Sequence, residues 1–276
     1  MPLGGDGFAV GIWLKNDKLM ERNDILEQFS RLLDVMNDLR EKCPWDMKQT
    51  WESIRPLSIE EVHELSDAIL ENNPNEVKKE LGDLLLHIVF YSKIASEQGL
   101  FDVGEVCDSL IQKLIRRHPH IYGDVVASDS ETVLKNWEQI KLQEKGEKKN
   151  GVLDGVPKGL NSIVKAFRMQ EKASQVGFDW DSADLAYEKV EEEWQEFQEA
   201  ETKEHQEEEF GDYLFALINF ARLKGINPDT ALEKCNIKFK TRFQSMEVQA
   251  ENLGKGLNDM SLDEMEALWQ NAKIKN

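Results

Sequence analysis

Cysteine and proline are both scarce in this sequence of 276 residues. Its three cysteines, Cys43, Cys107 and Cys235, lie far apart, so they form neither a disulfide framework nor a C-x-x-C metal knuckle. A reducing compartment explains such cysteines most simply, and we expect the protein in the cytoplasm. With only seven prolines and no alternation of polar and apolar residues, the sequence offers little that predicts β-strands.

Positive charge is lacking as well. The 34 Lys and Arg residues are outnumbered by 53 Asp and Glu residues, which gives a net charge of -19. Such a charge repels phosphate backbones and anionic lipid surfaces, so we expect neither a nucleic-acid polymer nor a membrane as partner. A small polyphosphate can still bind an acidic protein when cations bridge the two.

Long apolar runs are also missing, and none approaches the roughly 18 residues that a membrane span requires. The apolar stretch GFAVGIWL near the N-terminus has no basic segment before it and no cleavage pattern after it, unlike a signal peptide. Residues 1–24 are therefore predicted to form a loosely ordered N-terminal extension.

What the sequence has in abundance is apolar residues at helical spacing. They recur every three or four residues through residues 25–39, 106–114 and 214–221. The motif SIEE predicts a helix start with Ser58 as N-cap, and DSAD predicts another start at residues 181–184. Together these patterns predict an all-α fold made of helical bundles.

Four short motifs occur twice in the same order. The first set is CPWD, EEVHE, ELGD and KLIRR, and the second is GFDW, EEEWQE, EFGD and KFKTR. Four matched features predict a tandem duplication of a helical unit of about 100 residues. A Gly- and Lys-rich stretch without periodicity separates the two sets. We therefore predict a first unit at residues 25–142, a linker at 143–160 and a second unit at 161–276.

Acidic residues three apart recur in both repeats, and this spacing places each pair on one face of a helix. The pairs are Glu61 with Glu64, Glu80 with Asp83, Glu193 with Glu196, and Glu209 with Asp212. If the two helices of a repeat are antiparallel neighbours, four carboxylates meet, and their mutual repulsion requires a cation. Oxygen ligands on a rigid scaffold suit Mg²⁺ or Mn²⁺.

A glycine lies inside the second acid pair of each repeat, Gly82 in one and Gly211 in the other. Glycine in a helix interior costs about 1 kcal/mol relative to alanine. We expect the facing helix or a ligand to come close at both positions, because no side chain is in the way.

Basic residues four apart follow the acids in both repeats. Lys113 with Arg117, and Lys238 with Arg242, each share a helical face, as a phosphate clamp requires. Surface salt bridging is the alternative interpretation of each pair taken alone.

The combination of E-E-x-x-E, a spacer, E-x-x-D and a later Lys and Arg resembles the MazG-type all-α nucleoside triphosphate pyrophosphohydrolases. The motifs CPWD, RRHPH and VGFDW resemble the two-domain members of this family, over residues 25–276. The resemblance implies hydrolysis of nucleoside triphosphates between the α and β phosphates, with a broad range of bases. It also implies Mg²⁺ as cofactor, with Mn²⁺ as an alternative, a homodimer, and a role in nucleotide house-cleaning or nutrient-stress control.

Carried over by position, the resemblance assigns metal binding in the second repeat to Glu193, Glu196, Glu209 and Asp212. It assigns the grip on the phosphates to Lys238 and Arg242. Lys189 is a further candidate substrate contact. Trp180, Phe178 or Trp269 would stack on a base, unless they are plain core aromatics. Glu192, adjacent to the ligands, is the candidate general base.

The first repeat keeps the same set of residues as a second candidate site, made of Glu61, Glu64, Glu80, Asp83, Lys113 and Arg117. It differs in carrying His63 inside its acid motif and a longer spacer. We therefore favour the second repeat as the catalytic one and the first as a structural or regulatory partner.

Two other classes of protein remain open at this point. Acid pairs are common on solvated helix faces, so a non-enzymatic acidic dimerisation or regulatory module is one alternative. It predicts no effect of Mg²⁺ on stability. A di-iron carboxylate bundle is the other, because Glu60 and His63 make one Glu-x-x-His step, but the second repeat has Gln195 at the matching place.

Overall fold

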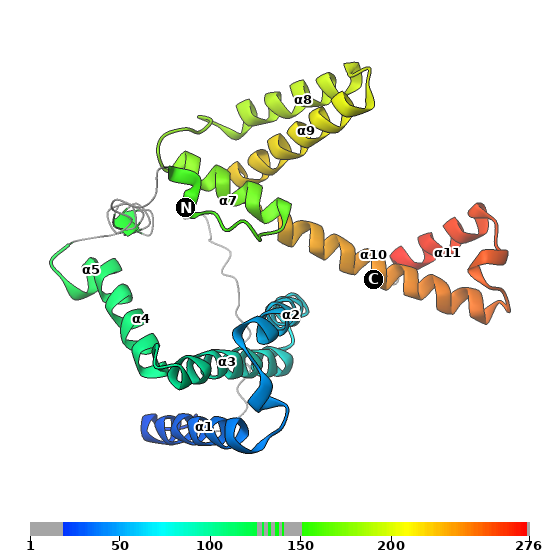
Figure 1. The fold of residues 1–276 in the computed structure, drawn as a ribbon. Coiled ribbons are helices and arrows are strands. Elements are labelled where there is room, and N and C mark those ends of the chain that lie inside the picture. The colour runs from blue at the N-terminus through cyan, green and yellow to red at the C-terminus, as the bar shows by residue number, and fades with distance from the viewer. Residues whose placement is uncertain are drawn as a thin grey trace, which may run out of the picture. The chain divides into compact units, whose positions relative to one another are not determined.

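The computed structural model describes residues 19–125, 129, 132, 133, 136, 137, 140 and 151–274 (Figure 1). These residues fall into two compact units, Met1–Leu114 and Ile115–Asn276. All regular structure in the described ranges is helical, without a strand, which confirms the predicted all-α class. None of the described helices is long and apolar enough to cross a membrane. Most of the predicted N-terminal extension and residues 143–150 of the predicted linker lie outside the described residues.

The first unit is built on three long helices: α1 (Arg22–Lys42), α2 (Trp51–Leu70) and α3 (Pro74–Glu97). α2 and α3 form an antiparallel hairpin, and α1 packs on α3. The buried core takes side chains from all three helices: Met36, Ile54, Val89, Phe90 and Ile94. The next helix, α4 (Val103–Arg117), crosses the boundary between the units.

Helix α2 begins at a different cap from the predicted one. Thr50 is the N-cap: its hydroxyl accepts a hydrogen bond from the Ser53 amide at 3.3 Å, and the Ser53 hydroxyl accepts from the Thr50 amide at 2.9 Å. Ser58, the predicted N-cap, lies within the helix and donates its hydroxyl proton to the Ile54 carbonyl. The prediction at Ser58 is therefore wrong, and the acids after it lie well inside a long helix.

The second unit repeats this arrangement. Its central helices are α7 (Ser162–Ser174), α8 (Ala183–Glu199) and α9 (Lys203–Leu223). α8 and α9 form an antiparallel hairpin, and α7 packs on α9 as α1 packs on α3. The predicted start of α8 is confirmed, because the Ser182 hydroxyl accepts from the Leu185 amide at 3.3 Å. The short helix α5 (Pro119–Tyr122) and the 3-10 turn η2 (Val152–Gly155) lie before α7 in the sequence.

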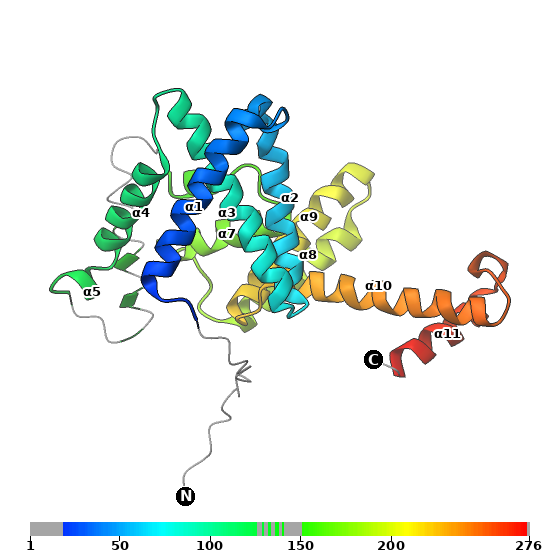
Figure 2. The same cartoon turned by 90° about the horizontal axis from the view of Figure 1, so that it is seen from below.

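A helical arm completes the second unit. It consists of α10 (Pro228–Asn252), the 3-10 turn η3 (Leu257–Asp259) and α11 (Leu262–Ile274). α11 packs on α10 around Met246, Ala250 and Leu268. Figures 1 and 2 both show this arm extending away from the hairpin of α8 and α9.

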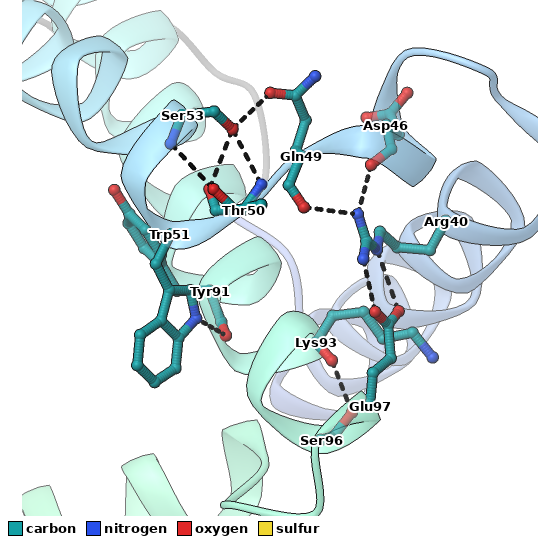
Figure 3. A network of polar contacts seen from close by, with 10 residues as sticks. All are labelled: Arg40, Asp46, Gln49, Thr50, Trp51, Ser53, Tyr91, Lys93, Ser96 and Glu97. Carbon is teal, nitrogen blue, oxygen red and sulfur yellow. Dashed lines mark hydrogen bonds and ion pairs between the residues drawn. The ribbon is translucent and has the colours of Figure 1, made fainter.

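A partly buried arginine, Arg40, connects three segments of the first unit around the CPWD motif (Figure 3). The Arg40 guanidinium donates from Nε and Nη2 to the two carboxylate oxygens of Glu97, at 3.0 and 2.5 Å. It also donates from Nη1 to the backbone carbonyls of Asp46 and Gln49, in and just after the 3-10 turn η1 (Asp46–Lys48). Because one side chain bridges α1, η1 and the end of α3, it fixes the loop that leads into α2.

Candidate functional site

Each repeat brings three of its four predicted acids into one cluster. In the second repeat, carboxylate oxygens of Glu193, Glu209 and Asp212 all lie within 4.8 Å of one another. In the first repeat the corresponding set consists of Glu61, Glu64 and Glu80. The two sets differ in the acid that is left out, which is Glu196 in the second repeat and Asp83 in the first. In both repeats the cluster joins the two helices of the hairpin, as the spacing predicted.

Two basic side chains, Lys189 and His205, lie against the acids of the second repeat. The Lys189 ammonium is 2.8 Å from a carboxylate oxygen of Glu193 and 2.9 Å from one of Glu192. Hydrogen bonds to Glu193 and Glu192 raise the pKa of Lys189 above its ordinary value. His205 Nε2 lies 2.9 Å from an oxygen of Glu209. The cluster thus holds excess negative charge that neighbouring basic groups partly offset.

The surplus negative charge also affects the acids themselves. Loss of hydration raises the pKa of Glu196, and the charge on Glu193 raises it further. In the first repeat the pKa of Glu61 is raised by burial and then by the charge on Asp83. A divalent cation would relieve both effects, because it favours the charged form of every carboxylate around it.

Glu80 shows most clearly that the acids of the first repeat suit a cation. Its side chain is almost fully buried, and one oxygen accepts a hydrogen bond from the Lys79 ammonium at 2.9 Å. The other oxygen, Oε2, is buried without a hydrogen-bond partner among the described residues. A buried carboxylate oxygen rarely stays unpaired. The donor set of oxygens therefore fits a hard divalent metal such as Mg²⁺.

A cavity of about 610 Å³ lies beside the acid cluster of the second repeat. Glu193 and Asp212 belong both to the cluster and to the wall of the cavity, as does Lys189. Much of the remaining wall is apolar and includes Phe178 and Trp180. A mainly apolar cavity of this size, with charged groups at one side, is typical of small-molecule sites.

Three polar residues of the cavity wall were missed by the sequence analysis: Gln170, Asn219 and Arg222. Gln170 is buried, and its Nε2 donates to the Phe215 carbonyl at 2.8 Å. Arg222 donates from Nε to Asn219 Oδ1 at 3.0 Å and forms an ion pair with Asp179. None of the three lies in an acid or basic motif, so only their placement in space identifies them.

The other predicted substrate contacts lie elsewhere. Trp180 lines the cavity, but Lys238, Arg242 and Trp269 are not among its lining residues. They belong to the arm of α10 and α11, where the Arg242 guanidinium lies 5.9 Å from the centroid of the Trp269 ring. The cavity of a single chain is therefore lined without these three residues.

The remaining predicted residues are placed as follows. Glu192 is largely exposed and is ion-paired with Lys189, outside the set of three clustered acids. Lys113 and Arg117 lie one turn apart on α4, but the boundary between the units falls between them. The phosphate clamp of the first repeat thus stays a prediction.

The two glycines inside the acid pairs do not touch the facing helix. A Cβ atom built on Gly82 or Gly211 would meet no described atom within 4 Å. The expectation that the facing helix approaches closely is therefore wrong, and the alternative, that a ligand comes close, stays a prediction.

The sequence is similar to that of known nucleotide hydrolases. The model of the MazG nucleotide pyrophosphohydrolase domain matches residues 49–122, which include the four acids of the first repeat. The chain is 44% identical to nucleoside triphosphate pyrophosphohydrolase/pyrophosphatase MazG of Thermotoga maritima, over 89% of this chain and 95% of that protein. It is 39% identical to nucleoside triphosphate pyrophosphohydrolase of Escherichia coli K12, over 90% and 98%. It is also 41% identical to the uncharacterized protein YabN of Bacillus subtilis, over 94% of this chain and 53% of that protein.

Proposed function

The chain belongs to the MazG family of nucleoside triphosphate pyrophosphohydrolases, and on this premise we propose that it hydrolyses nucleoside triphosphates to the monophosphate and pyrophosphate. The main support for the proposal is that the acid cluster of the second repeat lies at the edge of the cavity. Glu193 and Asp212 are part of both, so a metal-bound triphosphate and its nucleoside would fit side by side. The acid cluster serves the phosphates, and the cavity serves the nucleoside.

Mg²⁺, with Mn²⁺ as an alternative, is the proposed cofactor. Glu193, Glu209 and Asp212 would hold it, and Glu196, whose pKa responds to the charge on Glu193, would be the fourth ligand. When bound, the metal supplies charge neutralisation at the phosphates and lowers the pKa of water. Glu61, Glu64 and Glu80, with Asp83 beside them, would hold a metal in the first repeat in the same way.

The chain's own groups supply positioning and proton transfer. Lys189 is ion-paired with Glu193 and Glu192, and with a cation balancing Glu193 its ammonium would be available to contact a phosphate oxygen. Glu192 would then be the base that takes a proton from the attacking water. Trp180 stacks on the base in the cavity, and because every base has a stacking face, a broad base range follows.

Each repeat has a stripe of exposed apolar side chains at the same positions of its helix, and a second copy of the chain would cover both stripes. On α3 the stripe consists of Leu81, Leu85 and Ile88, and on α9 of Phe210, Leu214 and Leu217, each between 38% and 52% exposed. Gly82 and Gly211 each follow the first residue of a stripe and face open space. A partner helix could approach closely there, so we propose a homodimer.

The arm gives a second reason for a dimer. Lys238, Arg242 and Trp269 lie on the arm, away from the acids of their own chain. A partner's arm could bring equivalent residues to the phosphates. We propose that the complete site takes its acids from one copy and its phosphate clamp from the other.

The cellular role follows from the activity alone. Hydrolysis with a broad base range suits the clearing of non-canonical or excess nucleotides, or nutrient-stress control of nucleotide pools. The three cysteines of the chain are free, as a reducing cytoplasm requires. Both the role and the compartment are proposals that rest on these two points.

Product analysis tests the proposed reaction. The full chain is incubated with each common nucleoside triphosphate and Mg²⁺, and the products are separated by ion-exchange chromatography. We expect monophosphate and pyrophosphate, and no turnover when EDTA removes the metal. Diphosphate with orthophosphate, or no turnover with any nucleotide or metal, would refute the proposal and favour the non-enzymatic regulatory module.

A further inference from the structure

Two of the positions at which the repeats differ lie on the helix face of the last acid, and we infer that these two decide which repeat admits a nucleoside. They are Ala216 and Asn219 in the second repeat, and His87 and Phe90 in the first. The inference rests on the proposed function, because it names the residues that adapt the second repeat to a nucleotide. It predicts that both repeats bind metal and that only the second binds the whole substrate.

The register of the two repeats makes the positions equivalent. Asp83 on α3 and Asp212 on α9 are the last acids of their motifs. The fourth and seventh residues after each aspartate lie on the same helix face as the aspartate itself. In the first repeat they are His87 and Phe90, and in the second repeat they are smaller side chains.

In the first repeat the space beside the acids is filled. His87 is 8% exposed and Phe90 is 2% exposed. Phe90 belongs to the buried core with Met36 and Ile54, and the Arg40 guanidinium lies 5.5 Å from its ring centroid. A nucleoside could not enter here without displacing packed side chains, which is costly in a close-packed interior.

In the second repeat the same face is open. Ala216 and Asn219 both line the cavity of about 610 Å³ beside Glu193 and Asp212. An imidazole in place of the Ala216 methyl, or a phenyl ring in place of the Asn219 amide, would extend into that space. The cavity therefore depends on small residues at these two positions.

The polar groups of the cavity fit the edge of a nucleobase. Asn219 Oδ1 accepts a hydrogen bond from Arg222 Nε, so the Nδ2 group of Asn219 can donate a hydrogen bond to a ligand. Gln170 donates through Nε2 to the Phe215 carbonyl, which fixes the orientation of its amide. Its Oε1 is buried and has no hydrogen-bond partner among the described residues. A base that carries both an acceptor and an N–H donor would satisfy the two amides.

A matched pair of variants of the full chain tests the inference. Ala216→Leu places a leucine in the cavity, and His87→Leu places the same residue at the same register of the first repeat. The probes are a nucleoside triphosphate with a methylene bridge between the α and β phosphorus atoms, inorganic tripolyphosphate, and Mn²⁺ alone. Binding is measured by calorimetry, and folding by the melting temperature.

We expect Ala216→Leu to weaken binding of the nucleotide analogue by about tenfold or more, because the added group occupies the nucleoside space. Binding of Mn²⁺ and of tripolyphosphate should change by less than about twofold, and the melting temperature should not fall. His87→Leu should leave analogue binding within about twofold of the unaltered chain. A variant with merely poorer packing would instead lose stability and all three ligands together.

Two results would overturn the inference. Equal analogue binding by the unaltered chain and Ala216→Leu would refute it while leaving the proposed function intact. Loss of analogue binding in His87→Leu would assign the nucleoside to the first repeat. If Ala216→Leu does not fold, Asn219→Leu is scored by the same criteria. If the unaltered chain binds no analogue with any metal, the proposed function and this inference fall together.

Discussion

The two hairpins of this chain, α2 with α3 and α8 with α9, carry the same acids at the same register and differ in what lies beside them. On the helix face of its last acid the first repeat buries His87 and Phe90, whereas beside Glu193 and Asp212 the second repeat has a cavity. We therefore propose that metal ligation and nucleoside recognition are separable in this fold. The acids of two helices would serve the former, whereas the latter would need space that only small neighbours leave.

The largest contrast between the repeats is expected in catalysis. Glu209→Gln should lower turnover by about two orders of magnitude or more, because a lost metal ligand removes several kcal/mol of transition-state stabilisation. The matched Glu80→Gln variant should have a much smaller effect. Steady-state rates for both variants, at saturating nucleotide and Mg²⁺, measure the difference. Equal losses would mean that both repeats act in one reaction.

The two repeats should differ less in metal binding than in catalysis. A cation present at about 100 times its dissociation constant stabilises a folded site by about 2.7 kcal/mol. We expect Mn²⁺ to raise the melting temperature of the unaltered chain, and each of Glu80→Gln and Glu209→Gln to remove part of that rise. Calorimetric melts with and without metal provide the measurement. An unchanged melting temperature in the unaltered chain would favour acids that only solvate the surface.

A difference in pH dependence should follow from the ion pair of the first unit. The hydrogen bonds from Arg40 lower the pKa of Glu97 below its ordinary value of 4.5. A lowered acid pKa stabilises the folded state above about pH 4.5, and this stabilisation is lost as the pH falls through the lowered value. Because Glu97 is about one-third exposed, the contribution is about 1 kcal/mol or less.

Glu97→Gln should therefore melt lower than the unaltered chain at pH 7 and approach it as the pH falls towards about 3. The control is Arg222→Lys, which alters the second unit's ion pair with Asp179 and leaves Glu97 in place. A gap between Glu97→Gln and the unaltered chain that stays constant across the range would show that Glu97 acts by packing rather than by charge.

The smallest effects are expected at the two glycines. Gly82→Ala and Gly211→Ala should each add about 1 kcal/mol of helix stability within one chain, because no described atom opposes the new methyl group. If a second copy packs there, the same methyl weakens the dimer. We expect the dimer dissociation constant, measured by analytical ultracentrifugation, to rise in both variants. A stability gain with an unchanged constant would place the dimer contact elsewhere.

Much of the architecture could be predicted from the sequence because its signals are local. Helical periodicity predicted an all-α fold, and spacing of three predicted that acids would gather between the paired helices. The start of α2 was misjudged because the pattern from Ser58 to Glu61 matches a capping box, whereas Thr50 and Ser53 form the real one. Local patterns of this kind cannot choose between two competing caps.

The cavity and the arm could not be predicted, because both depend on packing between distant segments. Gln170 comes from α7, outside every recognised motif, and reaches the Phe215 carbonyl of α9. Lys238 and Arg242 have the right spacing for a phosphate clamp, but the direction of α10 takes them away from the acids of their own chain. Spacing along a helix does not determine where that helix goes.

The difference between the repeats is tested most directly by counting nucleotides per chain. The unaltered chain, Glu80→Gln and Glu209→Gln are titrated calorimetrically with the methylene-bridged analogue in the presence of Mn²⁺. We predict one nucleotide per chain in the unaltered protein, the same stoichiometry in Glu80→Gln, and none in Glu209→Gln. Binding retained in Glu209→Gln and lost in Glu80→Gln would contradict the account and place the nucleotide in the first repeat.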